Sequence, residues 1–167
     1  MIRGLVIRPV EDKDKDAIAG LLEAAFGGDA ERRLVACLRD DADVVLELVA
    51  THETEVVGHI LFSRLKVEGE EGETEAVALA PMAVLPAHQR SGIGSALVEN
   101  AHHVLSEQGE SLSVVLGEPD YYGRFGYRHD RAAGFACEYQ GPYLQAHAFA
   151  TAPASGRLVY APAFASL

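Results

Sequence analysis

The stretch from residue 84 to residue 105, VLPAHQRSGIGSALVENAHHVL, joins the end of a strand, a polar corner and the start of a helix. Two glycines, Gly92 and Gly94, stand where the helix begins, although glycine destabilises a helix interior. The first N–H groups of a helix lack internal partners, and the helix dipole attracts anions to them. Glycines there let phosphate oxygens reach the backbone. The stretch therefore predicts a phosphate site, with tight packing of strand against helix as the alternative reason for the glycines.

The polar corner can add side-chain donors to such a site. Gln89, Arg90 and Ser91 carry an amide, a guanidinium and a hydroxyl, and charge-assisted hydrogen bonds to phosphate are strong. The corner matches neither common nucleotide motif. The chain holds no GxxxxGK run followed by Ser or Thr, and a GxGxxG fingerprint would need glycine where Leu97 stands.

Outward from the corner, the spacing of apolar residues predicts a mixed α/β domain over residues 1–167, in the order β-α-α-β-β-β-α-β-α-β-β. Helices are expected with apolar faces over 18–26, 30–39 and 93–105, and a short one after Pro119. Strands are expected over 5–8, 44–50, 56–67, 76–84, 113–117, 134–138 and 146–151. The charged run 68–75 is expected to be a loop. Pro81 cannot donate to a sheet ladder, so a bulge or an edge is expected there.

Composition excludes several classes of protein. The formal net charge of −11 argues against a nucleic-acid surface. Solubility alone explains this charge, and cationic partners such as polyamines or aminoglycosides are the alternative. Cys37 and Cys137 lie far apart without a Cys/His cluster, which predicts two reduced, buried thiols and no metal site. No apolar run is long enough for a signal peptide or a membrane span, so the cytoplasm is the expected location.

Two motifs resemble those of the GNAT N-acetyltransferase superfamily. QRSGIG, residues 89–94, is similar to the family's Q/R-x-x-G-x-G/A signature, and EPDYYGRFGYR, residues 118–128, places Tyr122 four residues before Gly126-Tyr127. The order of strands also resembles that fold, and with IRPVEDKDKDAI and GRLVYAPAF the likeness extends over nearly the whole chain. It points to a bacterial branch of small acetyltransferases and implies a sheet split between its fourth and fifth strands.

The resemblance implies acetyl-CoA as cosubstrate, with its pantetheine arm in the split and its pyrophosphate on the glycine corner. It also implies direct transfer of the acetyl group to an amine, with Tyr122 as the proton donor to the departing thiolate. Tyr121 is the neighbour most easily confused with it. The implied cofactor residues are Met82, Ala83, Val84, Gln89, Arg90, Ser91, Gly92, Ile93, Gly94 and Ser95.

The general base is missing from its usual place. Many relatives carry a glutamate on the fourth strand, and that position is Ala78 here; the asparagine frequent after the fifth strand is also absent. A base from elsewhere or a water relay is then required. Glu118, Asp120, Glu75 and His59 are the candidates, although His59 lies in an apolar strand where a structural role is commoner. The adjacent pair His102-His103 is interpreted as solvated, since consecutive helix positions point apart.

The leading hypothesis is an N-acetyltransferase that acts on a small amine or on an amino group of a peptide. The absent glutamate and asparagine leave open a second one, a sensor or partner domain that binds acyl-CoA without turnover. A third hypothesis retains the fold but changes the acyl group that is transferred, because one fold serves many substrates. A homodimer is compatible with the resemblance, and the terminal YAPAF segment is expected to pack on the domain or on a second copy.

Overall fold

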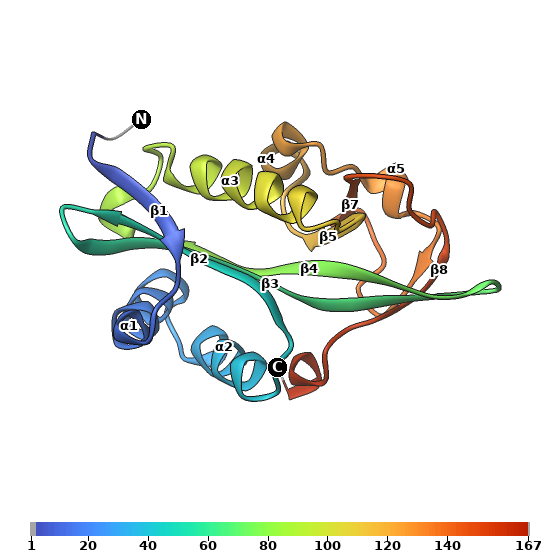
Figure 1. Ribbon diagram of the computed structural model, residues 1–167, viewed down its shortest axis with the longest axis horizontal. Coiled ribbons are helices and arrows are strands. Elements are labelled where there is room, and N and C mark those ends of the chain that lie inside the picture. The colour runs from blue at the N-terminus through green and yellow to red at the C-terminus, as the bar shows by residue number, and fades with distance from the viewer. Residues whose placement is uncertain (1–2, 167) are drawn as a thin grey trace.

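A long antiparallel hairpin runs through the middle of the sheet and projects beyond it (Figure 1). It consists of β3 (Glu55–Gly69) and β4 (Gly72–Val84). The prediction of a loop over 68–75 is therefore wrong for most of that run, because the strands pair as far as Gly69 and Gly72. The charged side chains are accommodated because the projecting end of the hairpin is solvated.

The computed structural model describes residues 3–166. Met1, Ile2 and Leu167, at the ends of the domain predicted over 1–167, lie outside the described residues. None of the helices within residues 3–166 has both the length and the apolar character that a membrane crossing requires.

The sheet has the order β1-β2-β3-β4-β5-β7, and β8 extends it along the far part of β3 and pairs with β6. Neighbours are antiparallel except β4–β5 and β6–β8. A parallel neighbour needs a crossover, and the long helix after β4 supplies it. The other strands are β1 (Leu5–Pro9), β2 (Val44–His52), β5 (Leu112–Leu116), β6 (Phe135–Ala136), β7 (Leu144–Ala148) and β8 (Gly156–Val159).

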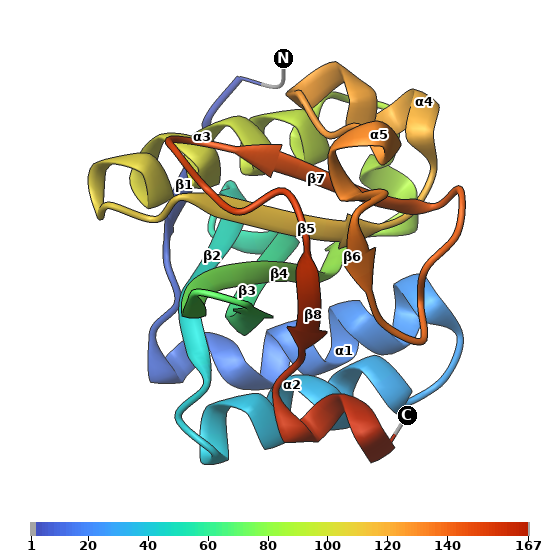
Figure 2. The ribbon, with the colours of Figure 1, turned by 90° about the vertical axis from the view of Figure 1, so that its right-hand side faces the viewer.

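Helices cover both faces of the sheet (Figures 1 and 2). One face carries α1 and α2, and the other carries α3, with α4 beyond its N-terminal half. The helices are α1 (Lys15–Phe26), α2 (Ala30–Asp40), α3 (Ile93–Glu107), α4 (Pro119–Tyr122) and α5 (His129–Ala132). The predicted first helix ends as expected, since Gly27 adopts a left-handed conformation with φ of 76°.

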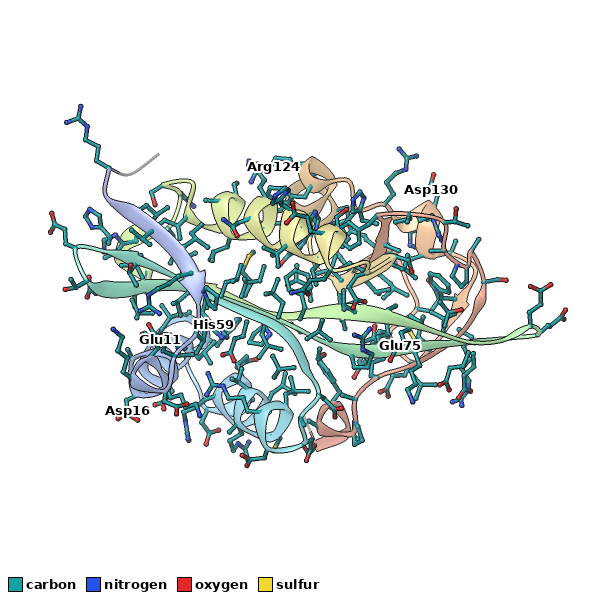
Figure 3. The ribbon with its side chains drawn as sticks, viewed as in Figure 1. Glu11, Asp16, His59, Glu75, Arg124 and Asp130 are labelled. Atoms are coloured by element: carbon teal, nitrogen blue, oxygen red, sulfur yellow. The ribbon has the colours of Figure 1, made fainter. Side chains whose placement is uncertain are left out.

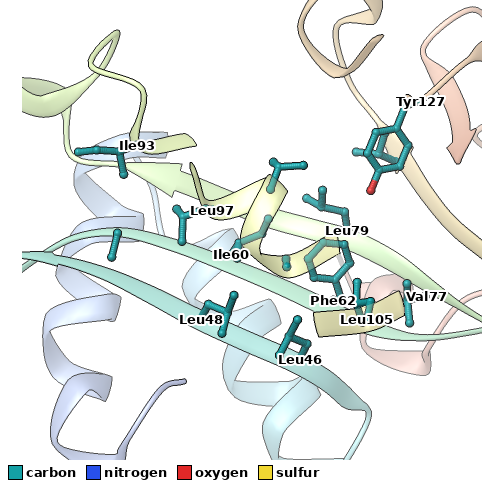
Figure 4. Close-up of a cluster of buried hydrophobic side chains, with 14 of the residues drawn as sticks. Leu46, Leu48, Ile60, Phe62, Val77, Leu79, Ile93, Leu97, Leu105 and Tyr127 are labelled. Carbon is teal, nitrogen blue, oxygen red and sulfur yellow. The ribbon is translucent and has the colours of Figure 1, made fainter. Parts of the chain in front are cut away.

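Three apolar clusters hold these layers together. The first lies between α3 and the sheet, where Leu97 and Leu105 pack on Ile60 and Phe62 (Figure 4). The second joins α1 and α2 to the opposite face and includes Phe164 near the C-terminus. The terminal YAPAF segment thus packs on its own domain. The third cluster fills the end of the sheet formed by β5, β7 and β8.

β4 and β5 separate after a short paired stretch. Their parallel register ends at Leu79 with Val115, so β4 from Ala80 to Val84 has no strand on that side. The ladder with β3 is irregular between Ile60 and Phe62, opposite Pro81, which confirms the predicted bulge. The split expected from the resemblance is therefore present.

The sequence prediction misplaced the short C-terminal elements and one cysteine. β6 and β7 are shorter than the strands expected over 134–138 and 146–151, and β8 and α5 were not expected. Elements of two to five residues are too short to show a period. Cys37 is exposed because the buried side of α2 is formed by Leu34, Val35 and Leu38; Cys137 is half-buried, and both thiols are free.

Candidate active site

The glycine corner, residues 88–95, leaves a row of backbone N–H groups free. Arg90 and Gly92 have φ angles of 62° and 88°, in the left-handed region. The first hydrogen bond of α3 runs from the N–H of Ala96 to the carbonyl of Gly92 (3.0 Å). The N–H groups of Ile93, Gly94 and Ser95 precede that bond and have no acceptor within residues 3–166. Such a row at a helix N-terminus is an anion site.

A cavity of about 370 Å³ lies over this row. Among the described residues that line it are the cations Arg90 and Arg124 and also His88, but no carboxylate. In a chain with net charge −11, a patch without acidic groups favours an anionic ligand. All predicted cofactor residues except Ser91 line this cavity; its full lining is Met82, Ala83, Val84, His88, Gln89, Arg90, Gly92, Ile93, Gly94, Ser95, Tyr121 and Arg124.

The polar side chains of the corner hold the corner itself. The amide Nε2 of Gln89 donates to the carbonyl of Val84 (3.1 Å), and the hydroxyl of Ser91 donates to the carbonyl of His88. The side chain of Ile93 is buried in the α3 core. These residues therefore offer a ligand their backbone rather than the side-chain donors that the sequence suggested.

Arg124 is a site residue that the sequence analysis missed. Its guanidinium donates to the hydroxyl of Ser95 (3.2 Å) and lies 4.8 Å from the ring centre of Tyr121. Figure 3 shows it on the α3 side of the sheet, far from Glu75. A Cβ placed on Gly94 would meet the Tyr121 hydroxyl, so any larger residue there would have to displace the end of the Tyr121 side chain. The sequence could have indicated Arg124, because this cation lies between Tyr122 and Gly126 in the motif EPDYYGRFGYR.

A second cavity, of about 280 Å³, occupies the split between β4 and β5. We call it the split cavity. It reaches the α1–α2 side of the sheet, where Glu31 and Leu34 line it, and Tyr122 lines it from α4. Met82 lines both cavities, so a ligand chain along β4 could pass from one to the other. The full lining is Phe26, Glu31, Leu34, Ala78, Leu79, Ala80, Pro81, Met82, Val114, Leu116, Tyr122, Tyr139, Tyr160 and Phe164.

The open edge of β4 presents backbone groups to this passage. The N–H of Leu85 donates to the carbonyl of Val57 (2.9 Å). Residues of an antiparallel ladder alternate between bonding to the neighbour and facing away, so Ala83 is also bonded to β3. The groups of Met82 and Val84 face the other edge, from which β5 has diverged. Met82 and the N–H of Val84 are therefore free to pair with a ligand, whereas the Val84 carbonyl accepts from Gln89.

The adjacent tyrosines belong to different cavities. Tyr121 lines the cavity at the glycine corner, and Tyr122 lines the split cavity. Burial, together with the neighbouring Tyr121, raises the pKa of the Tyr122 phenol to about 12. Burial also raises the pKa of Tyr121, against the opposing charge of Arg124. At neutral pH both phenols carry their protons and can donate a hydrogen bond.

None of the four candidate bases lines either cavity. Glu75, Glu118 and Asp120 are exposed elsewhere. His59 is fully buried, and its Nε2 lies 2.7 Å from a carboxylate oxygen of Glu47, as expected for a structural group. Ala78, the position of the missing glutamate, lines the split cavity.

His102 corrects the prediction of a solvated histidine pair. Its Nε2 lies 3.0 Å from the Tyr127 hydroxyl, and its ring stacks on His147 with centres 5.1 Å apart. Burial, together with the nearby His147, lowers the pKa of His102 to about 4. Only His103 is exposed as expected. The buried face of α3 is wider than its apolar residues indicated, because it includes His102.

The chain resembles known acetyltransferases in sequence. Residues 6–129 match the model of the acetyltransferase (GNAT) domain. The chain is 36% identical over 138 residues to the uncharacterized N-acetyltransferase YhbS of Escherichia coli K12, covering 82% of this chain and 81% of the relative.

Solved structures extend the likeness to the whole fold. The crystal structure of Escherichia coli YhbS in complex with CoA superposes with a TM-score of 0.88 at 31% identity, covering 99% of this chain and 94% of that one. A GNAT family acetyltransferase from Brucella melitensis in complex with acetyl-CoA gives a TM-score of 0.82 at 32% identity, covering 96% of this chain and 97% of that one. The fold expected from the sequence is thereby confirmed.

Proposed function

Because this chain belongs to the GNAT family of acetyltransferases, we propose that it transfers the acetyl group of acetyl-CoA directly to a primary amine of a small molecule or peptide. The observation that carries the proposal is the free N–H row of the glycine corner, joined through Met82 to the split cavity. The two similar structures that contain CoA and acetyl-CoA support this choice of cosubstrate.

The cofactor would lie along both features. Its pyrophosphate would accept hydrogen bonds from the N–H groups of Ile93, Gly94 and Ser95, with Arg90 and Arg124 neutralising its charge. Its pantetheine amides would pair with the free backbone groups of Met82 and with the N–H of Val84, as an added strand pairs with a sheet edge. The thioester would then reach the split.

The reaction replaces a C–S bond by a C–N bond and removes one proton from the amine. The amine nitrogen attacks the thioester carbonyl carbon, the C–S bond breaks, the nitrogen loses a proton, and the thiolate of CoA leaves. A free N–H on β4, from Met82 or Val84, would stabilise the oxyanion. Tyr122 would stabilise the departing thiolate mainly by donating a hydrogen bond. A phenol whose pKa is about 12 holds its proton more tightly than a thiol, whose pKa is about 8.5.

The proton of the amine would leave through water. Ala78 cannot accept it, and the buried His59 is engaged with Glu47. A water relay requires only that the split cavity open to solvent, and the half-exposed Leu116 and Phe26 at its rim leave such an opening.

The same residues 1–167 would serve as one domain, since the segment after the family match adds β6, β7 and β8 to the same sheet.

The absent glutamate at Ala78 favours one alternative function, a domain that binds acyl-CoA without turnover. Calorimetric titration with acetyl-CoA, CoA and ATP, followed by thiol release with a panel of amines, separates the two. We expect micromolar binding of acetyl-CoA that ATP does not match, and thiol release that depends on an amine. Binding without release from any amine would indicate the sensor, while competition by succinyl-CoA or longer acyl-CoAs would identify a different acyl group. No binding would overturn the proposal.

A further inference from the structure

We propose that the split cavity selects a small apolar monoamine, with Glu31 holding the amino group and an aromatic wall holding the apolar body. This inference rests on the proposed function and names the class of acceptor. It concerns the side of the split opposite the glycine corner. It differs from the polyamine or aminoglycoside acceptor that the net charge of the chain had suggested.

Glu31 is the one charged residue among the described lining of the split cavity. It stands in the first turn of α2. Its neighbours Arg32 and Arg33 pair with Asp29 and Glu23, whereas Glu31 makes no ion pair or side-chain hydrogen bond within residues 3–166. A half-buried carboxylate beside apolar walls attracts a cation more strongly than one in open solvent. A single carboxylate can form an ion pair with the single ammonium group of a monoamine.

Another part of the cavity lining is aromatic. The rings of Tyr139 and Tyr160 meet edge to face with centres 5.1 Å apart, and Tyr160 meets Phe164 at 5.4 Å. Burial raises the pKa of Tyr160 and of Tyr139, so these phenols remain neutral and offer no second anion. Ring faces accommodate an alkyl or aryl group and also favour a nearby ammonium.

The mouth of the cavity is apolar as well. Phe26 is 44% exposed and Leu116 is 51% exposed, and both belong to the small group of large apolar side chains that the described part of the chain leaves exposed. Exposed apolar groups beside a hollow mark a binding site for an apolar ligand. A polyamine or aminoglycoside would have to leave its further cations against these side chains without a partner.

The size of the cavity sets a further limit. Its volume of about 280 Å³ lies just below the usual range of ligand pockets, about 300–1,000 Å³. A phenylethylamine-sized acceptor fits this volume, with its amine toward Glu31 and Tyr122 and its ring against Tyr160. The acceptor nitrogen would then lie beside the thioester that enters along β4.

The test compares 2-phenylethylamine, spermidine and kanamycin as acceptors with acetyl-CoA, by thiol release, in the wild-type chain and in Glu31→Gln. We expect 2-phenylethylamine to have the highest kcat/KM and Glu31→Gln to raise its KM at least about 10-fold, with unchanged KM for acetyl-CoA. Glu99→Gln is the matched control, since Glu99 is exposed on α3 and lines neither cavity.

A second variant and a binding measurement keep the outcome clear. Leu116→Lys places a cation at an exposed rim position and should also raise the KM for 2-phenylethylamine. Titration of 2-phenylethylamine into the CoA complex should show binding that Glu31→Gln weakens by the same factor. Preference for the polycations, or unchanged amine binding in both variants, would overturn the inference while leaving acetyl-CoA turnover intact. Failure of acetyl-CoA to bind would instead overturn the proposed function.

Discussion

The glycine corner and the split cavity are built in opposite ways. The corner is a single run of residues, 88–95, that works through backbone N–H groups and is completed by one cation, Arg124. The split cavity is assembled from side chains between Phe26 and Phe164, contributed by both helical layers, two strands and the C-terminal segment. The corner carries positive charge, whereas the cavity is apolar and has one carboxylate.

Because the two regions are built differently, substitutions are expected to affect their ligands differently. A site made of backbone groups depends on glycines and φ angles, so it tolerates few substitutions but accepts the same ligand in every relative that keeps them. A site made of scattered side chains can change its ligand with one substitution and leave the fold intact. Each region should therefore control the affinity for one substrate only.

The largest effect is expected from Gly92→Val. Gly92 has a φ of 88°, which a β-branched residue rarely adopts, so the first turn of α3 must shift and misdirect its N–H groups. Loss of two charged hydrogen bonds, each about 1.5–3 kcal/mol, should weaken acetyl-CoA binding at least about 100-fold by calorimetry. Gly20→Ala is the control, because nothing lies within 4 Å of a Cβ there and affinity should not change. Equal affinity in Gly92→Val would show that the pyrophosphate does not bind at the glycine corner.

A second comparison sets Tyr122→Phe against Tyr121→Phe. The two rings meet edge to face at 5.0 Å, yet they line different cavities. Tyr122→Phe should lower kcat about 10- to 100-fold through loss of thiolate support, with unchanged affinity for acetyl-CoA. Tyr121→Phe should alter that affinity and leave kcat nearly unchanged. The reverse pattern in steady-state kinetics would move the catalytic hydroxyl to Tyr121.

Most of the fold and the corner could be predicted from sequence because both depend on local patterns. The helix faces, the bulge at Pro81 and the glycine corner each lie within a short window. The resemblance predicted the split, but the lining of the split cavity could not be predicted, since Glu31, Tyr139 and Phe164 come together only through the sheet order. Glu31 looks in sequence like an ordinary charge in the first turn of a helix.

The errors have the same origin. His102 was expected to be solvated because its neighbours along α3 gave no sign of His147, which reaches it from another strand. The loop over 68–75 was expected because charge and glycine usually indicate a turn, whereas pairing with β3 extends the strand. In both cases a partner on another strand decided the outcome.

A third prediction uses a region outside both sites. Burial would raise the pKa of Glu47, but hydrogen bonds from His59 and Arg39 outweigh it and lower the pKa to about 2. The carboxylate therefore stabilises the fold above its usual pKa, and that stability is lost as pH falls from about 4.5 toward 2. The loss is about 2 kcal/mol after solvent screening.

Glu47→Gln should remove much of this acid-dependent loss in urea unfolding and lower stability at neutral pH. The KM values for both substrates should stay unchanged, because Glu47 and His59 line neither cavity. A bell-shaped activity profile that disappears in His59→Gln, with stability retained, would instead make His59 the general base.

The smallest effect concerns Arg124, the one part of the corner that is not local in sequence. Arg124→Gln should weaken acetyl-CoA binding about 10-fold, and Arg124→Lys should weaken it less, because the charge stays but the planar fork is lost. Arg128→Gln is the matched control, since Arg128 is exposed and pairs with Asp130 at 2.7 Å. The difference between wild type and Arg124→Gln should shrink in high salt, which screens an exposed charge. If Arg124→Gln changed the KM for the amine and not for acetyl-CoA, the division between the two regions would fail, because this cation would then serve the acceptor.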